Sequence, residues 1–277
     1  MGLRYAYNTN GTANHRLTDA LELIADCGYD GVALTLDHHH FDPFAPELSR
    51  RADELSTQLQ RLKLGLVLET GARYLLDPRQ KHEPTLVSPE PEGRARRIEF
   101  LWRAIQIAEA CGAEAVSFWA GVVREGVAVE DARGWLRAGV AELVERNASD
   151  VMLAFEPEPG MLVEDVADFL ELQRQVPQLR LALDTGHCIV SGGVEPADAI
   201  HQQRENLATV SLEDMPRGKH EHLPFGEGDM DTAAVLRALR DVGYSKLACV
   251  ELSRDSHRAH SMVPQALAYL RNAEKQL

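Results

Sequence analysis

Three short apolar segments in the second half of the chain each end in a carboxylate. They are Leu153-Ala154-Phe155-Glu156, Leu181-Ala182-Leu183-Asp184 and Ala248-Cys249-Val250-Glu251. Side chains alternate between the two faces of a strand, so each acid shares its face with a small residue two positions earlier, and the bulky residues occupy the other face. Carboxylates that converge at one end of a buried parallel sheet repel one another unless a proton or a cation neutralises them. The pattern therefore predicts a divalent metal site.

Two long connections, 71–93 and 215–230, carry further polar residues of catalytic type, and connections of that length usually cover or build a site. The first contains Arg73, Lys81 and His82, whose cations suit a phosphate or a carboxylate, although a solvated loop is the alternative. The second contains His220 and His222 beside a glycine-rich turn, and neutral imidazoles are good ligands for zinc and similar metals.

A run of histidines, His38-His39-His40, follows the second predicted strand, and Trp119 stands at the end of the fourth. Both lie on the face of the sheet where the acids fall. We take His40 and Trp119 as candidate substrate-binding residues. A metal-ligand or loop-structural role for the histidines and a core position for Trp119 are the alternatives.

Strand-like apolar segments alternate with amphipathic helical patterns along the whole chain. Several helical patterns end at a glycine before the next strand, as at Gly28, Gly112 and Gly243. Repeated units of this kind predict a (β/α)8 TIM barrel that forms one domain over residues 1–277, with its active site at the carboxyl ends of the strands. The predicted strands lie near 3–8, 31–37, 64–70, 113–120, 151–157, 179–185, 207–214 and 246–252.

The composition is that of a globular enzyme domain, with 277 residues and 44% hydrophobic residues. The formal net charge of −14 argues against a nucleic-acid partner, and we expect the cluster Arg94, Arg96 and Arg97 to be a solvated helix face. No apolar segment is long enough to span a membrane, and no apolar signal-peptide core follows Met1, so we expect a cytoplasmic protein. The four cysteines are widely spaced, which favours free thiols.

The motifs in residues 150–255 resemble those of the xylose isomerase-like barrels, a superfamily of metal-dependent sugar and sugar phosphate isomerases and epimerases that also contains endonuclease IV. Asp184-Thr185-Gly186-His187 resembles the DxGH motif at the end of strand six. The segment from His222 to Gly228, HLPFGEG, resembles the HxPxGxG turn after strand seven. Glu156 and Glu251 match the family's acids on strands five and eight.

The resemblance implies a metal held by Glu156, Asp184 and Glu251, but the fourth usual ligand, a histidine on strand seven, is Ser211 here. Glu213 has the same strand parity as Ser211, and its longer side chain could reach the metal; we also take it as a candidate substrate-binding residue. In endonuclease IV the positions that match His187, His220 and His222 also ligate metal, which makes a two-metal site an alternative. The ion implied is Mn2+, Mg2+, Co2+ or Zn2+.

By this resemblance the protein is a metal-dependent isomerase or epimerase that acts on a sugar, a sugar phosphate or a related α-hydroxy carbonyl compound through an enediolate. Glu156 and Glu251 are the candidate acid and base, His187 holds a substrate oxygen, and Arg73 or Lys81 binds the distal end. A metal-dependent hydrolase or lyase and an inactive binding subunit are the alternatives. Trp119 stands where endonuclease IV has a ligand histidine, which argues against DNA cleavage. Barrels of this family are often homo-oligomers.

Overall fold

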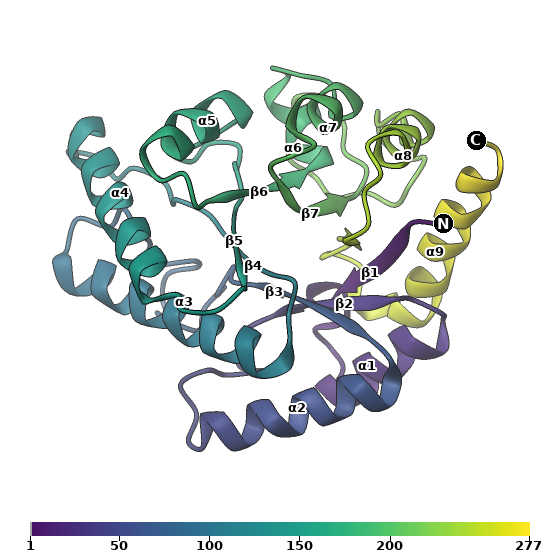
Figure 1. Ribbon diagram of the computed structural model, residues 1–277, viewed down its shortest axis with the longest axis horizontal. Helices are drawn as coiled ribbons and strands as arrows, with labels where there is room; N and C mark the ends of the chain where they lie inside the picture. The colour runs from purple at the N-terminus through teal and green to yellow at the C-terminus, as the bar shows by residue number, and fades with distance from the viewer. Residues whose placement is uncertain (1) are drawn as a thin grey trace.

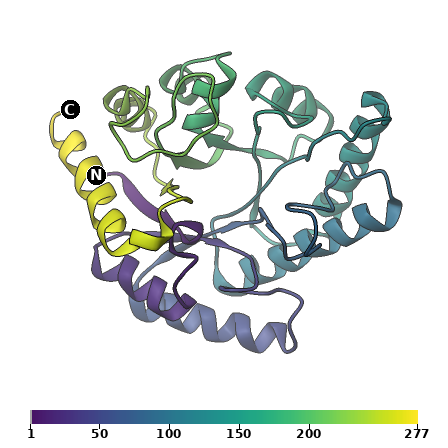
Figure 2. The same cartoon turned by 180° about the vertical axis from the view of Figure 1, so that it is seen from behind.

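The computed structural model describes residues 2–277, in which eight parallel strands close into a barrel surrounded by helices (Figures 1 and 2). This confirms the predicted (β/α)8 barrel. The strands are β1 (Arg4–Asn8), β2 (Gly31–Thr35), β3 (Gly65–Glu69), β4 (Ala115–Phe118), β5 (Met152–Phe155), β6 (Arg180–Asp184), β7 (Leu207–Leu212) and β8 (Leu247–Val250). The α-helices are α1 (Leu17–Asp26), α2 (Leu48–Leu62), α3 (Pro91–Cys111), α4 (Val129–Arg146), α5 (Val166–Gln175), α6 (Thr185–Ser191), α7 (Pro196–Gln203), α8 (Thr232–Asp241) and α9 (Ala259–Lys275). Two short 3-10 helices, η1 (Thr9–Thr12) and η2 (Ser256–Arg258), follow β1 and β8.

The barrel closes between β1 and β8, which pair in parallel from Arg4 opposite Leu247 to Tyr7 opposite Val250. Helix α9 then lies beside the start of β1, as Figure 1 shows. The amide of Leu3 donates a hydrogen bond to the Glu274 carboxylate over 2.9 Å. The first and last elements of the fold are therefore joined directly.

Small side chains fill the interior of the barrel, as the alternation in the sequence predicts. Two interior clusters are formed by Ala6, Ala33, Val67, Leu247 and Cys249, and by Ala115, Ala154, Ala182 and Ala208. Ala154, Ala182 and Cys249 are the residues two positions before Glu156, Asp184 and Glu251, so these acids continue the inward-facing rows toward the carboxyl end of the barrel. The bulky neighbours face the helices, as Phe155 of β5 does against Phe169 of α5.

The strands are shorter than predicted. The fourth, expected over 113–120, covers only Ala115–Phe118, and Glu156 and Glu251 come directly after the last residues of β5 and β8. The backbone pairing nevertheless continues for one step, because the amide of Glu156 donates to the Phe118 carbonyl and that of Glu251 to the Leu212 carbonyl. The acids therefore sit at the barrel rim with their backbone still held by neighbouring strands.

The two long connections contain no helix or regular strand between residues 70 and 90 or between 213 and 231, apart from one bridge that joins Asp214 and Leu223. Among residues 2–277, no helix combines the length and the apolar character that a membrane crossing requires. The four cysteines are free thiols.

One arginine departs from the expected solvated face of α3. Arg96 is exposed and Arg94 is half-buried, but Arg97 is completely buried. Its guanidinium stacks on Trp119, with 4.3 Å from Cζ to the ring centroid, and donates to the Thr70 carbonyl over 2.8 Å. Charge alone suggested solvent, whereas the helical position of Arg97 directs it under the end of β4.

Candidate active site

A cavity of about 200 Å³ opens at the carboxyl ends of the strands. Side chains from β1, β2, β3, β5 and β8 reach it, together with residues of the long connections. It is lined by Asn8, Asn10, Thr35, Glu69, Gly71, Arg73, Lys81, His82, Trp119, Glu156, Glu158, Met161, His187, His220, His222, Glu251 and Ser253. Eight of these 17 residues carry a carboxylate or an imidazole.

Two of the lining acids, Glu69 and Glu156, stand on either side of Ser117. Glu69 ends β3 and is the register partner of Ser117 on β4, while the Ser117 hydroxyl donates to Glu156 Oε2 over 3.2 Å. Burial raises the pKa of both carboxyl groups well above the usual value, and each is raised further by other acids of the cluster. These two acids therefore favour a proton or a cation.

The third acid, Asp184, is the N-cap of α6, and its Oδ1 accepts the amide of His187 over 2.9 Å. Its Oδ2 is buried and has no hydrogen-bond partner among residues 2–277. The His187 ring is oriented by the Pro157 carbonyl, 2.9 Å from Nδ1. Burial opposes charge on both side chains, yet their mutual attraction lowers the pKa of Asp184 and, together with Glu158, raises that of His187.

The resemblance implied a ligand histidine on β7, where this chain has Ser211, and Glu213 follows two residues later. Glu213 is completely buried, its Oε2 contacts Nδ1 of His222, and its Oε1 has no partner in the described chain. Gly186 of α6 leaves the room that this carboxyl group needs, since a Cβ there would lie 2.9 Å from Glu213 Oε1. Burial and then the charge of Asp184 raise the pKa of Glu213 well above its usual value.

His220 joins the cluster from the connection after β7. Its ring meets that of His187 edge-on, with 5.0 Å between centroids, and its Nδ1 lies 3.8 Å from a Glu158 oxygen. Burial, followed by the charges of His187 and His222, lowers the pKa of His220 to about 4. A neutral imidazole in this position can donate a lone pair to a metal.

The donor set fits a divalent cation. Two groups of three residues each place ligand atoms within 4.8 Å of one another: Glu156 with Asp184 and His187, and Glu158 with His187 and His220. The unpartnered oxygens of Asp184 and Glu213 and the raised pKa values of the glutamates mark a cluster that lacks positive charge. The structure thus brings the predicted ligands Asp184, His187, His220, His222, Glu156 and Glu251 to one end of the barrel.

Glu251 approaches the cavity from β8, and the Asn10 amide donates to its Oε1 over 2.7 Å. Asn10 belongs to η1, which follows β1 directly. A polar side chain from the 3-10 helix that follows the neighbouring strand therefore fixes the orientation of this carboxylate.

The predicted substrate-binding residues divide into two groups. Arg73, Lys81, His82 and Trp119 line the cavity, and Glu213 reaches it through His222. His40 is not brought to the cavity: its ring is buried, and its Nε2 lies 3.2 Å from the His15 carbonyl. The neighbouring His38 and His39 line a wider mouth of about 720 Å³ that adjoins the cavity.

Sequence reasoning did not single out Glu69 and Glu158. Glu69 ends the apolar segment Gly65-Leu66-Val67-Leu68-Glu69, which has the same pattern as the three acid-bearing segments and could have been found by it. Glu158 has no such signal, because it lies beyond Pro157, where the chain has left the strand.

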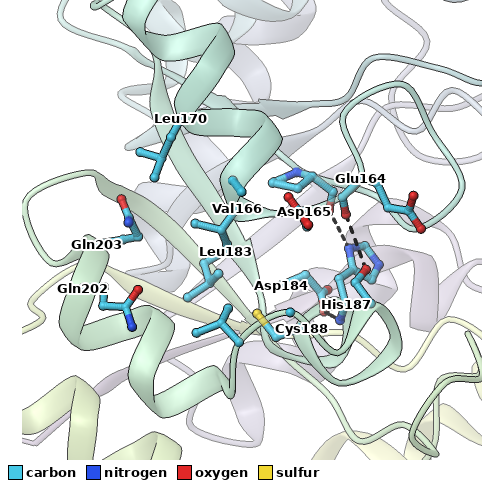
Figure 3. A pocket seen from close by; sticks show the side chains of 15 residues that line it. Glu164, Asp165, Val166, Leu170, Leu183, Asp184, His187, Cys188, Gln202 and Gln203 are labelled. Atoms are coloured by element: carbon cyan, nitrogen blue, oxygen red, sulfur yellow. Dashed lines mark hydrogen bonds between the residues drawn. The ribbon is translucent and has the colours of Figure 1, made fainter.

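A second cavity, of about 210 Å³, lies on the other side of His187, between α5, α6 and α7 (Figure 3). Figure 3 shows Asp184 and His187 at one end and Gln202 and Gln203 at the other, with apolar side chains between them. The thiol of Cys188 also lines it, and burial raises its pKa to about 12. A thiol in that state is a poor nucleophile, so we place the chemistry in the first cavity.

The fold and the first cavity define a (β/α)8-barrel protein with a candidate metal site at the carboxyl ends of its strands. The family model for the xylose isomerase-like TIM barrel matches residues 21–273. The chain belongs to this family, as its motifs in residues 150–255 predicted.

Known proteins with similar sequence or structure include several named as sugar epimerases. An L-ribulose-5-phosphate 3-epimerase of Shigella flexneri is 25% identical over 240 residues, which cover 84% of this chain and 81% of the relative. The 3-keto-D-glucoside 4-epimerase of E. coli has a TM-score of 0.76 at 15% identity and covers 98% of this chain and 99% of its own. The zinc-bound IolI protein has a TM-score of 0.77 at 18% identity, with 99% of both chains covered.

Proposed function

We propose that this protein is a divalent-metal-dependent epimerase or isomerase of a sugar or a related α-hydroxy ketone. The observation that carries the proposal is the ring of inward-facing carboxylates around a histidine-lined cavity at the barrel rim. The curated relative that acts on L-ribulose 5-phosphate supports it. The cavity volume of about 200 Å³ supports a small substrate, and its charged lining supports a polar one.

The residues that would hold the cation are Glu156, Asp184 and His187, with Glu251 and the Glu213–His222 pair beside them. A bound divalent ion would polarise the substrate carbonyl and acidify the neighbouring C–H bond. Glu213, two residues after Ser211, contacts His222, and we assign this pair the role of the missing strand-seven histidine, which is to complete the donor set.

Glu156 and Glu251 are the proposed acid and base. They come from β5 and β8, which are separated by β6 and β7, so their carboxylates approach the cavity from different directions. One takes the proton from the carbon next to the carbonyl and leaves an enediolate of the substrate, and the other returns a proton to the opposite face or to the neighbouring carbon. Asn10 and Ser117, which bond these two carboxylates, hold them in place.

The proposal is tested by incubating ketopentoses, ketohexoses and their phosphates with the protein and Mn2+, Mg2+, Co2+ or Zn2+ in D2O. Proton NMR should show loss of the C–H signal next to the carbonyl and formation of the epimer or isomer. Glu156→Gln and Glu251→Gln should each reduce the rate by about 100-fold or more, as loss of a general acid or base does. Glu145→Gln, an exposed acid on α4, is the matched control. Full activity of either cavity variant would refute the assignment.

A hydrolase or lyase is the second candidate, because Glu158, His187 and His220 form a second group with ligand spacing. Elemental analysis of the purified protein separates the two. One ion per chain that is lost with Glu156→Gln but retained in His220→Ala supports the epimerase. Two zinc ions, one of which is lost with His220→Ala, support the hydrolase. Absence of metal under every loading condition would leave a binding subunit.

A further inference from the structure

The segment Gly71–Thr85, which follows β3, is built with an unusual backbone. Ala72, Arg73 and His82 all have left-handed backbone angles, with φ values of 60°, 38° and 69°. Residues other than glycine rarely adopt such angles because they are strained, and such angles concentrate at sites where geometry matters for function. The position of Arg73 is therefore imposed by its surroundings.

His82 closes this segment on itself. Its amide donates to the Arg73 carbonyl over 2.6 Å, and its Nδ1 lies 2.6 Å from the Gly71 carbonyl. The other side of the ring meets Trp119 edge-on, with 5.5 Å between centroids. Residues 71–82 thus form a closed loop that is anchored to the cavity wall.

Arg97 supports Trp119, the residue of the cavity wall that His82 contacts. This buried guanidinium stacks on Trp119 and donates to the Thr70 carbonyl, at the point where the segment leaves β3. Arg97 therefore holds two parts of this region: the backbone at Thr70, where the segment begins, and the Trp119 ring that His82 contacts.

This construction places Arg73 and Lys81 where the inner cavity joins its mouth, since both residues line both spaces. In the described part of the chain, neither forms an ion pair, whereas Arg254 at the same mouth pairs with Glu221 over 2.8 Å. Asp37, an acid at the mouth, already accepts the amides of two histidines. Two cations without carboxylate partners thus face an entrance whose inner end is acidic.

We propose that the substrate carries an anionic group, a phosphate monoester or a carboxylate, at the end away from the acid cluster, and that Arg73 and Lys81 bind it. This inference rests on the proposed epimerase function and specifies its substrate class. A guanidinium can bind either anion through two parallel hydrogen bonds, and an ammonium adds a point charge. A neutral sugar would leave neither cation in an ion pair.

The test compares kcat/KM for free ketopentoses, ketopentose 5-phosphates and keto sugar acids in wild type, Arg73→Met and Lys81→Met. Arg79→Met is the matched control, because Arg79 belongs to the same segment but is exposed and pairs with Asp77. We expect the wild type to prefer one anionic class by at least about tenfold to hundredfold, the range of charge-assisted hydrogen bonds. That preference should collapse in Arg73→Met and Lys81→Met and persist in Arg79→Met.

A preference for the phosphates identifies a phosphate site, and a preference for the acids identifies a carboxylate site. Equal turnover of free and anionic sugars that Arg73→Met leaves unchanged would overturn the inference and leave the epimerase intact. If no sugar exchanges its proton in D2O, the proposed function fails. Calorimetric titrations with inorganic phosphate and with a simple carboxylate then decide the anion site alone. Binding of either anion that is lost in Arg73→Met supports the site, whereas binding of neither, or binding that Arg73→Met leaves unchanged, refutes it.

Discussion

Replacing Glu156 by glutamine should change the stability of the metal-free and metal-loaded protein in opposite directions. The ligand oxygens of Glu156 and Asp184 lie within 4.8 Å of each other. At an effective dielectric constant of about 20, two ionised carboxylates at this separation repel by about 3 kcal/mol. The amide of Glu156→Gln removes this repulsion, so we expect the metal-free variant to be more stable than the wild type by up to about 3 kcal/mol.

Differential scanning calorimetry in EDTA and in excess Mn2+ measures both effects. For a chain of this length, about 1 kcal/mol corresponds to about 2–4 °C in Tm, so the variant should unfold several degrees higher in EDTA. Mn2+ should stabilise the wild type strongly through binding and the variant weakly or not at all. The exposed replacement Glu145→Gln should match the wild type in both buffers. A lower Tm of Glu156→Gln in EDTA, or equal stabilisation by Mn2+, would refute the reasoning.

The same experiment has a defined pH dependence. Burial raises the pKa of Glu156 in the folded protein well above its ordinary value of 4.5. A raised folded-state pKa means that the group costs the metal-free fold nothing when the pH is well below 4.5, and that the cost grows as the pH rises from 4.5 toward the folded-state pKa. The difference in Tm between the metal-free wild type and the variant should therefore be largest near neutral pH and shrink as the pH falls to 4.5.

Three further outcomes follow from packing around the site. Gly228→Ala would place a Cβ 2.3 Å from an Asp214 oxygen that accepts a backbone amide. We therefore expect the free energy of unfolding, measured by urea denaturation, to fall by about 2–4 kcal/mol. An unchanged midpoint would contradict this. Arg97→Met should raise KM more than it lowers kcat, because Trp119 loses its support, and steady-state kinetics with equal effects on both would argue against a positioning role. Cys249 should not react with a thiol reagent until the protein unfolds, since burial inside the barrel raises its pKa.

The sequence predicted the barrel and the acids for the same physical reason. Strand periodicity is local, and in a parallel barrel every strand ends at the same rim, so Glu156, Asp184 and Glu251 had to converge once the strand count was known. Glu69 follows the same rule, because it ends an apolar segment with the same alternation. The same alternation also predicted that the residues two positions before these acids, such as Ala154 and Ala182, face the barrel interior.

The remainder of the site depends on contacts that no local pattern contains. The ring of His40 points to the His15 carbonyl. His220, in the connection after β7, instead contacts His187 of α6. Arg97 looks like its neighbours on α3 in sequence, and only the docking of that helix under Trp119 decides that it is buried. Such placements arise from tertiary packing, which periodicity does not encode.

The proposed proton transfer and the proposed binding of the substrate's distal end lie on different parts of the structure, so each could be varied independently. The carboxylates stand on strand ends whose backbone is fixed by the barrel ladder, whereas Arg73 and Lys81 stand on a loop that is closed by its own hydrogen bonds at His82. A library that randomises the exposed positions 74 and 78–81, and retains Arg73, His82 and the buried Leu75 and Leu76, would therefore alter which molecules are accepted without disturbing the carboxylates. In directed evolution, this segment is the natural unit of exchange for changing the substrate range of the barrel.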